Sequence, residues 1–393
     1  MASRLSNKRK IKSLITVTTS GIALSGGLLL YQGNEKFFNQ VVMPVTRLLD
    51  PEVAHNFGIK AAKWGLLPTQ KIQDPVSLKT TLWGLQFDNP LGMAAGFDKQ
   101  GEAIPGLQKM GFSFVEIGSV TPQPQLGNPK PRVFRLLEDT AVINRYGFNS
   151  DGHEVVYNRL KEVKEDPNFE GIVGVNLGKN KLSEDAAFDY MEGLRKFSDL
   201  ADYFVVNISS PNTPGLRNLQ NKNNLHNLLL KLNETRETLK KQTPLLLKLA
   251  PDLTEEERQN IAEVVLNKKT QVDGLIISNT TIDRSHLKSV NRDEIGGLSG
   301  KPLTQTSTEM IADMFQRTKG KVPIIGVGGI FSGSDAYEKI KAGASLVQIY
   351  TSFIYHGPPI VGKIKDELNK LLLQDGYSSL SEAVGKNSNS STK

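Results

Sequence analysis

Residues 207–217 have side chains of the types that bind small polar molecules. They read Asn-Ile-Ser-Ser-Pro-Asn-Thr-Pro-Gly-Leu-Arg and follow 203–206, an apolar, β-branched and aromatic run that predicts a buried strand. The two prolines and the glycine cannot continue a strand, so we expect a rigid turn at its exit. Amides and hydroxyls on such a turn suit a ligand site, and they equally suit a capped turn.

Runs of this kind recur eight times, and most of the gaps between them contain amphipathic helical sequence. The runs are 91–97, 114–120, 172–178, 203–209, 244–250, 274–280, 322–329 and 346–352. Near-continuous apolar runs are typical of strands buried on both faces of a parallel sheet. Eight strand–helix units over about 260 residues favour an α/β fold of the (β/α)8 TIM-barrel type, with a doubly wound open sheet as the alternative.

The ends of these runs bring polar groups and glycines to one level, where a barrel of this type has its active site. They include Gly96, Asp98, Lys99, Ser119, Asn176, Gly178, Asn207, Lys248, Ser278, Asn279, Gly328, Gly329, Tyr350 and Thr351. The set is rich in amides, hydroxyls and lysines but poor in carboxylates and histidines. It therefore argues against a hydrolytic metal centre, which needs His/Asp/Glu clusters, and against a carboxylate pair for glycoside cleavage.

Three late segments predict an anion site. Leu298-Ser299-Gly300-Lys301 lies between the sixth and seventh runs, Gly328-Gly329 ends the seventh, and Tyr350-Thr351 ends the eighth. Glycines let backbone N–H groups approach an anion, and phosphate binds at this position in many barrels. Together the segments predict a phosphorylated substrate or the tail of a flavin mononucleotide, although each glycine alone could serve a tight turn.

The chain has 393 residues, a net charge of +7 and no cysteine. Disulfides, thiolate metal sites and cysteine catalysis are therefore excluded. Five basic residues precede the first acidic residue, Glu35, so most of the excess charge belongs to the N-terminus. A basic surface for nucleic acid is not predicted.

The N-terminal segment has the features of a targeting sequence. Residues 1–12 contain arginine, lysine and serine but no acid, as mitochondrial transit peptides do. Residues 13–34 are uncharged and mostly apolar, close to the roughly 20 residues that a membrane helix needs. We expect residues 1–34 to be a mitochondrial targeting segment and a single inner-membrane anchor, with a secretory signal peptide as the alternative. The basic flank would then stay in the matrix, and the catalytic domain would face the intermembrane space.

Two short amphipathic helical patterns occupy residues 35–70, the first interrupted by Pro44 and the second preceded by Asp50 and Pro51. They would either lie on the bilayer surface or pack on the main domain. Residues 71–375 are expected to form the catalytic barrel, with one hairpin within 76–87 and another from 132–135 and 141–143. The Ser/Asn-rich residues 376–393 are expected to form a flexible tail.

Six motifs resemble those of class 2, quinone-linked dihydroorotate dehydrogenases. In chain order they are 93–99 (MAAGFDK), 144–150 (NRYGFNS), 175–180 (VNLGKN), 207–212 (NISSPN), 278–281 (SNTT) and 326–330 (GVGGI). Motifs of this length in one order are specific, and the resemblance extends over roughly residues 45–375. One departure is Ser278, where family members often have threonine, and the hydroxyl is kept.

The resemblance implies an enzyme of pyrimidine biosynthesis that oxidises (S)-dihydroorotate to orotate, with FMN as cofactor and ubiquinone as final acceptor. It implies that Ser210 takes a proton from C5 while C6 gives a hydride to the flavin. The implied substrate residues are Lys99, Asn144, Arg145, Tyr146, Gly147, Phe148, Asn149, Asn207, Asn212, Asn279 and Thr280. The implied flavin residues are Ala95, Gly96, Ser119, Asn176, Asn207, Lys248, Ser278, Gly300, Gly329, Tyr350 and Thr351. His55 and Arg135 match the polar residues at the inner end of the family's quinone tunnel.

The residue types suit this chemistry except at Ser210. Amides can pair with the cyclic urea of the substrate, Lys99 with its carboxylate or a developing enolate, and Lys248 with a reduced flavin. A serine hydroxyl is a poor general base, and none of the five histidines falls in these motifs. We therefore expect Thr213 and trapped water to relay the proton, and an alkaline activity optimum.

Two other functions fit the residue types. A flavin-free aldolase or isomerase could use Lys99 or Lys248 as a Schiff-base nucleophile. A membrane-tethered sensor could bind a small molecule without transforming it. Bound flavin, which colours a protein yellow, distinguishes the oxidoreductase from both. The expected partners are dihydroorotate, ubiquinone and membrane lipid, with no nucleic acid and no metal.

Overall fold

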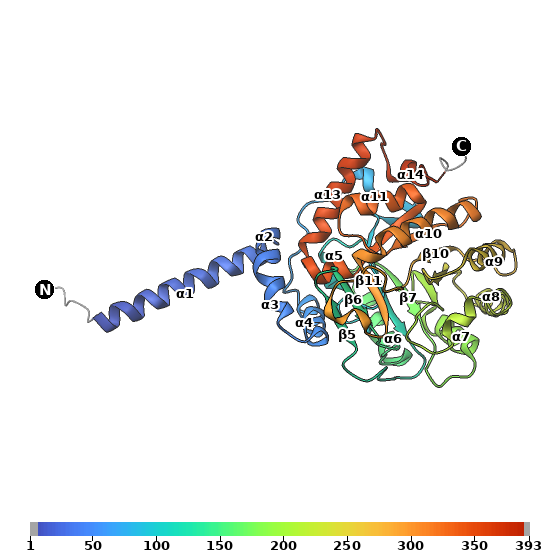
Figure 1. Cartoon of the computed structure of the whole chain (residues 1–393), viewed down its shortest axis with the longest axis horizontal. Coiled ribbons are helices and arrows are strands. Elements are labelled where there is room, and N and C mark those ends of the chain that lie inside the picture. The colour runs from blue at the N-terminus through green and yellow to red at the C-terminus, as the bar shows by residue number, and fades with distance from the viewer. Residues whose placement is uncertain (1–6, 389–393) are drawn as a thin grey trace.

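Eight parallel strands close into a barrel at the centre of the molecule (Figure 1), which the computed structural model describes over residues 7–388. The strands are β3 (Leu91–Met93), β4 (Phe114–Val120), β7 (Ile172–Leu177), β8 (Tyr203–Asn207), β9 (Leu245–Leu249), β10 (Gly274–Ile277), β12 (Ile324–Val327) and β13 (Ala344–Ile349). The ring is closed because β10 pairs with both β9 and β12. This confirms the (β/α)8 barrel, excludes the open sheet, and places a strand in each predicted run.

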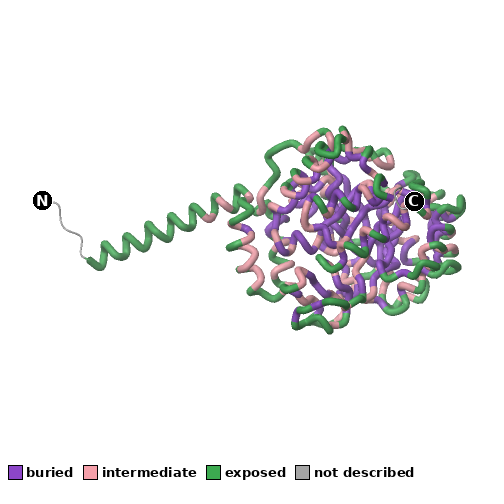
Figure 2. Tube along the Cα trace, turned by 45° about the horizontal axis from the view of Figure 1, so that its top comes forward, coloured by how far each residue is buried: buried purple, intermediate pink, exposed green. Residues whose placement is uncertain are grey.

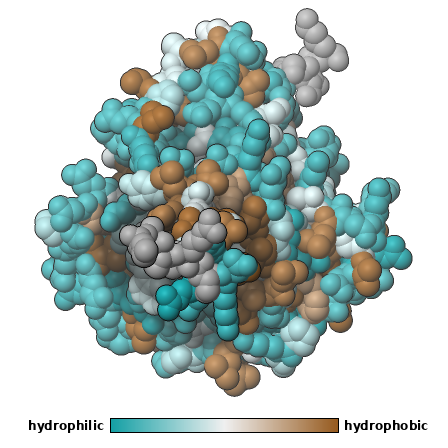
Figure 3. Space-filling model, turned by 90° about the vertical axis from the view of Figure 1, so that its left-hand side faces the viewer, coloured by the Kyte–Doolittle hydropathy of each residue, from teal (hydrophilic) through white to brown (hydrophobic). Residues whose placement is uncertain are grey.

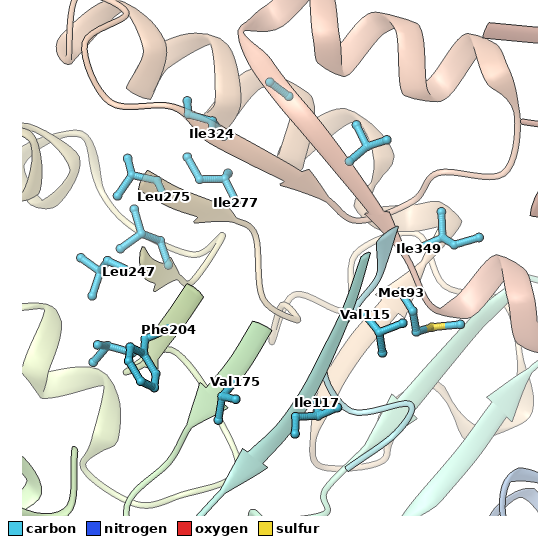
Figure 4. Close-up of a cluster of buried hydrophobic side chains, with 14 of the residues drawn as sticks. Met93, Val115, Ile117, Val175, Phe204, Leu247, Leu275, Ile277, Ile324 and Ile349 are labelled. Carbon is cyan, nitrogen blue, oxygen red and sulfur yellow. The ribbon is translucent and has the colours of Figure 1, made fainter. Parts of the chain in front are cut away.

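Side chains that alternate along the strands form two separate cores. In β8, Tyr203 and Val205 belong to the cluster inside the barrel, together with Phe114 of β4. Phe204 and Val206 belong to the larger cluster between the strands and the surrounding helices (Figure 4). Because both faces of each strand are buried, the strands are apolar at consecutive positions.

Helices cover the outer face of the barrel. They are α5 (Ile104–Lys109), α6 (His153–Glu165), α7 (Ala186–Phe197), α8 (Lys222–Glu237), α9 (Glu255–Leu266), α10 (Thr304–Arg317), α11 (Gly333–Ala342), α12 (Thr351–His356) and α13 (Pro359–Gln374). Local signals start several of them: Thr254 and Glu257 form a reciprocal capping box at α9, and Asp185 caps α7.

A hairpin closes the amino-terminal end of the barrel, as predicted. It consists of β1 (Thr80–Leu82) and β2 (Leu85–Phe87), which pair antiparallel. The rings of Trp83 and Tyr203 lie 6.0 Å apart, and those of Phe87 and Phe114 lie 5.4 Å apart. These aromatic contacts fill this end of the barrel and leave the carboxyl ends of the strands for a site.

The second predicted hairpin gains a strand that the sequence did not predict. β5 (Val133–Leu136) pairs with β6 (Ala141–Asn144), and β11 (Gly297–Gly300) pairs antiparallel with β6. Residues 298–301 had been interpreted only as a glycine-rich anion loop. At Gly300, where φ is +110°, a Cβ would lie 2.5 Å from the carbonyl oxygen of Thr140, so only glycine fits.

The N-terminal helix α1 (Asn7–Tyr31) projects away from the barrel and buries none of its residues (Figures 1 and 2). Within residues 7–388 it is the one helix that is long and apolar enough to cross a membrane, judged by length and composition. Its extent and composition agree with the predicted anchor.

The extension after α1 packs on the barrel and leaves apolar side chains exposed. α2 (Glu35–Phe37), a π-helical turn (Phe38–Val42) and α3 (Met43–Arg47) precede α4 (Pro51–Lys63), which Asp50 caps as predicted. Phe38 and Ile59 are buried, whereas Leu48 and Trp64 are exposed. Figure 3 shows apolar side chains gathered on the N-terminal side of the molecule.

The prediction of a flexible tail from residue 376 is wrong as far as Ser388. The short helix α14 (Leu380–Ala383) packs on the barrel, with Leu380 and Ala383 fully buried. The Ser-rich composition predicted disorder, although Leu380 and Ala383 are apolar residues that bury against the rest of the protein. Residues 389–393 lie outside the described part of the chain.

Candidate active site

A pocket of about 1060 Å³, including the space at its mouth, lies at the carboxyl ends of the barrel strands. Of the predicted substrate set it is lined by Lys99, Asn144, Tyr146, Gly147, Phe148, Asn149, Asn207, Ser210, Asn212, Asn279 and Thr280. Of the predicted flavin set it is lined by Ala95, Gly96, Ser119, Lys248, Ser278, Gly300, Gly329, Tyr350 and Thr351.

Two residues of the predicted substrate and flavin sets lie outside this pocket lining. Arg145 turns away from the pocket, where its Nη1 lies 2.6 Å from Oε2 of Glu294, so the structure does not support it as a substrate contact. Its sequence neighbours Asn144 and Tyr146 both line the pocket. Asn176 is fully buried below the pocket and accepts a hydrogen bond from the hydroxyl of Ser119. It can therefore position Ser119 rather than meet a ligand directly.

The loop after β8 brings Ser210 to the pocket. The Ser210 hydroxyl oxygen accepts a long hydrogen bond from the backbone N–H of Asn212, at 3.3 Å. Arg217 holds the loop by donating to the carbonyl oxygen of Ser209 at 3.0 Å and to that of Thr280 at 2.9 Å. Its third contact is with Asp252, 2.7 Å away. The loop thus has a defined conformation over the site.

Side-chain amides form a connected layer around this loop. Asn207 donates to the hydroxyl of Ser119 at 2.9 Å and accepts from Asn279 at 3.1 Å. Asn279 also donates to the Ser209 hydroxyl at 2.9 Å. Amides fixed in this way present donors and acceptors in set directions, as recognition of a planar heterocycle requires.

Lys99 provides the cation at the substrate side of the pocket. Its Nζ lies 4.0 Å from the centre of the Tyr146 ring and donates to the carbonyl oxygen of Gly96. Burial, together with the nearby charge of Arg132, lowers the pKa of Lys99 to about 7. A bound carboxylate would favour the protonated form.

Lys248 faces a buried carboxylate that the sequence analysis missed. Its Nζ lies 3.7 Å from Oε1 of Glu116, which is fully buried inside the barrel. Glu116 also accepts hydrogen bonds from Asn176 at 2.8 Å and from Gln348 at 2.7 Å. An acidic residue within the apolar run 114–120 was the signal that could have revealed it, because a buried charge requires partners.

The glycine pair after β12 packs against the start of α10. A Cβ at Gly329 would lie 2.2 Å from Oγ1 of Thr304, and one at Gly328 would lie 3.0 Å from Leu303. Gly328 and Gly329 both have positive φ, and both line the pocket. The backbone is therefore exposed to the pocket at this point, as an anion site needs.

His55 and Arg135, the predicted quinone residues, lie on the side of the N-terminal extension. The His55 ring stacks 6.4 Å from that of Tyr350, and burial together with the charge of Lys99 lowers the pKa of His55 to about 3. Arg135 donates to the carbonyl oxygens of Thr46 in α3 and of Leu49 in the turn between α3 and α4. His55 is therefore neutral at physiological pH and adjoins an aromatic residue of the pocket.

The donor set fits a flavin mononucleotide. Amides, hydroxyls, Lys248 and bare glycine backbone line the pocket, and none of its described lining residues is Asp, Glu or His. Such donors match the carbonyl and imide edge of an isoalloxazine ring and a phosphate group. Within residues 7–388, no group of three or more His, Cys, Asp or Glu side chains could hold a metal ion.

The fold and site define a (β/α)8-barrel enzyme with a polar, lysine-containing pocket at the carboxyl ends of its strands. The family model "Dihydroorotate dehydrogenase" matches residues 77–372. The chain belongs to the dihydroorotate dehydrogenase family, in its class 2, quinone-linked branch, and is an enzyme of that family. The resemblance inferred from the six motifs is thereby confirmed.

Relatives match nearly the whole chain. Dihydroorotate dehydrogenase (quinone), mitochondrial, of Mus musculus is 50% identical over 98% of this chain and 99% of its own length. The protein of the same name from Arabidopsis thaliana is 48% identical over 95% of this chain and 88% of its own length. A crystal structure of DHODH from Eimeria tenella in complex with ferulenol has a TM-score of 0.84 and 44% identity, covering 87% of this chain and 98% of that chain.

Proposed function

We propose that this protein oxidises dihydroorotate to orotate, uses FMN as its bound cofactor, and passes the electrons to a quinone. The main support is the convergence of Lys99, Ser210 and Lys248 from three different strand ends on one pocket that lacks carboxylates among its described lining residues. The relatives named dihydroorotate dehydrogenase (quinone) support the same substrate and acceptor.

The proposed reaction forms a double bond between C5 and C6 of the substrate. The C5 proton leaves to Ser210, and the C6 hydrogen leaves with two electrons as a hydride. FMN, when bound, supplies the hydride acceptor. Lys99 orients the substrate carboxylate, and the amides of Asn207 and Asn279 pair with the cyclic urea.

Ser210 is the proposed base, and its proton must then leave the pocket. No histidine among the described residues lines the pocket, so the usual Ser–His arrangement is not available there. Thr213, buried on the same loop, is the next hydroxyl along the chain and is the proposed relay with water. Lys248, beside the flavin, would stabilise negative charge on the reduced cofactor.

The quinone is proposed to approach from the side of α3 and α4, near His55 and Arg135. Helix α1 is proposed to anchor the protein in the inner mitochondrial membrane by a single pass. The basic residues before it would then lie in the matrix, and the barrel in the intermembrane space. Protease treatment of mitochondria with a ruptured outer membrane tests this orientation, because the barrel should be digested only after rupture.

Flavin analysis tests the proposed activity. The purified protein should be yellow and should release about one FMN per chain on denaturation. Anaerobic dihydroorotate should bleach the visible flavin absorbance, and a soluble ubiquinone analogue should restore it. A colourless protein, or flavin unaffected by dihydroorotate, would contradict the proposal.

A further inference from the structure

Lys339 on α11 is a buried lysine that forms no ion pair with any carboxylate in the described part of the chain. It is fully buried, and its Nζ donates to Ser307 Oγ at 2.5 Å, to Thr308 Oγ1 at 2.8 Å and to the carbonyl oxygen of Thr304 at 3.1 Å. All three partners are uncharged. Burial lowers the pKa of Lys339 to about 7, because hydrogen bonds to uncharged groups only partly replace the lost water, and an anion bound nearby would favour the protonated form.

The two other lysines that are almost completely inaccessible to solvent among the described residues have acidic partners. Lys248 lies 3.7 Å from Glu116, and Lys365 lies 2.7 Å from Asp74. In the same helix, Asp335 acts on Lys339 only through its charge, and its carboxylate accepts hydrogen bonds from the N–H of Phe331 and the hydroxyl of Ser332. The neighbouring Glu338 pairs with Lys341. A buried charge usually has an ionic partner, so Lys339 needs an explanation.

Lys339 lies directly behind the glycine pair of the pocket. A Cβ at Gly326 of β12 would lie 3.4 Å from the Lys339 Cβ, so the lysine stem runs along the outer face of this strand. The Ser307 hydroxyl, which accepts from Lys339, donates to the carbonyl oxygen of Gly328 at 3.0 Å. One hydroxyl therefore separates the ammonium from the backbone of the pocket.

The hydrogen-bond chain from Lys339 through Ser307 ends at the peptide unit that carries the N–H of Gly329. The carbonyl of Gly328 and the N–H of Gly329 belong to the same planar peptide unit. A donor to that carbonyl polarises the unit and makes its N–H a stronger donor, and hydrogen bonds in series reinforce each other. The charge of Lys339 thus raises the affinity of the Gly329 N–H for an anion in the pocket.

We propose that Lys339 is a positioning residue for the flavin phosphate, acting through Ser307 and the Gly328–Gly329 peptide, and that it gives the pocket its preference for FMN over riboflavin. The inference rests on the proposed function, since it requires a flavin in this pocket. The phosphate dianion acts as the anionic partner that Lys339 does not have within the described part of the protein. Lys339 does not touch the phosphate, so its effect is electrostatic.

The test compares two ligands that differ only in the phosphate. The full-length chain is stripped of flavin, and the affinities for FMN and riboflavin are measured by quenching of flavin fluorescence. Lys339→Met should weaken FMN binding by about tenfold to a hundredfold, the range for losing an interaction with a charged group. It should change riboflavin binding less than about twofold. Lys339→Arg, which keeps the charge, should retain most of the preference for FMN.

Controls separate an electrostatic role from a structural one. Lys365→Met removes an equally buried lysine that is paired with Asp74 and lies outside the pocket lining, so it should leave the FMN-to-riboflavin affinity ratio unchanged. Lys339→Gln removes the charge but keeps a donor, and it gives the same comparison if the methionine variant does not fold. If the neutral variants Lys339→Met and Lys339→Gln keep the FMN-to-riboflavin affinity ratio of the parent, the inference about Lys339 is wrong, but the proposed function still stands. A parent chain that binds neither flavin overturns the proposed function as well.

Discussion

The guanidinium of Arg217 lies 2.7 Å from the carboxylate of Asp252 and holds the Ser210 loop against the loop after β9. Arg217 also donates to the carbonyl oxygen of Thr280, after β10. This arrangement predicts that Arg217→Ala loosens the loop and raises KM for dihydroorotate by about tenfold or more, because the charged hydrogen bonds that hold the loop over the pocket are lost. Flavin content should not change. Steady-state kinetics with a quinone analogue measure the effect.

Arg258 offers a matched control for the loop variant. It forms a 2.6 Å ion pair with Asp313, and the side chains of this pair are about as exposed as those of Arg217 and Asp252. Arg258→Ala should lower stability modestly and leave KM unchanged. Equal KM values in both variants and the parent would mean that the ion pair does not control the loop.

The pKa of Lys99 predicts a pH dependence of substrate affinity. Burial lowers this pKa to about 7 in the free protein, and the anionic substrate binds the protonated form. Protonated Lys99 predominates below pH 7 and is lost as the pH rises, so KM for dihydroorotate should rise above about pH 7. The value of kcat should still increase with pH, because Ser210 must lose a proton. Profiles of KM and kcat between pH 6 and 10 test both statements.

Lys99→Arg is the informative variant for this profile. A guanidinium stays charged throughout the assay range, so the rise in KM above about pH 7 should disappear even if the absolute affinity is lower. A parent-like rise in KM in this variant would show that another group titrates.

The pair Glu116 and Lys248 predicts opposite shifts of the flavin reduction potential. Glu116→Gln removes a buried negative charge and should raise the potential, whereas Lys248→Met should lower it. The expected size is tens of millivolts, since about 30 mV corresponds to about 1.4 kcal/mol for a two-electron couple. Each variant also leaves a buried charge unpaired, so stability should fall by about 3–5 kcal/mol. Spectroelectrochemistry of the bound flavin measures the potentials, and shifts of the same sign would contradict this assignment.

Deletions at the N-terminus should separate the reduction of the flavin by dihydroorotate from its reoxidation by quinone. Deleting residues 1–34 should release the protein from membranes and leave reduction by dihydroorotate unchanged. Deleting residues 1–67 also removes α4, which packs so closely on α5 that a Cβ at Gly106 would lie 2.1 Å from the carbonyl oxygen of Ala62. That variant should reoxidise poorly with quinone. Stopped-flow measurement of each half-reaction tests this, and normal reoxidation would exclude α4 from the quinone site.

The barrel and most of its pocket could be predicted from sequence for physical reasons. Strands buried on both faces are necessarily apolar along their length, and their carboxyl ends meet on one side of the barrel. The residues that were missed depend on partners remote in the chain. The burial of Glu116 is explained by Lys248, Asn176 and Gln348, which come from three other strands. Strand β11 is explained by its pairing with β6.

The environments of two side chains, Lys339 and Arg145, could not be predicted because they depend on tertiary packing. Lys339 occupies an ordinary position in an amphipathic helix. Only the packing shows that its side chain is buried and forms no ion pair with a carboxylate among the described residues. Arg145 stands within a pocket motif, but its side chain points to the opposite side. Sequence patterns place residues on a segment, whereas side-chain direction on an irregular loop depends on tertiary contacts.

Flavin reduction in the Ser210→Ala variant tests the central claim most directly. The variant should retain FMN, and its anaerobic reduction by dihydroorotate should slow by about 10²–10⁴-fold, the usual contribution of a general base. The matched change Ser285→Ala, at an exposed serine outside the pocket lining, should have no effect. Reduction of the Ser210→Ala variant at the parent rate would contradict the assignment of Ser210 as the base.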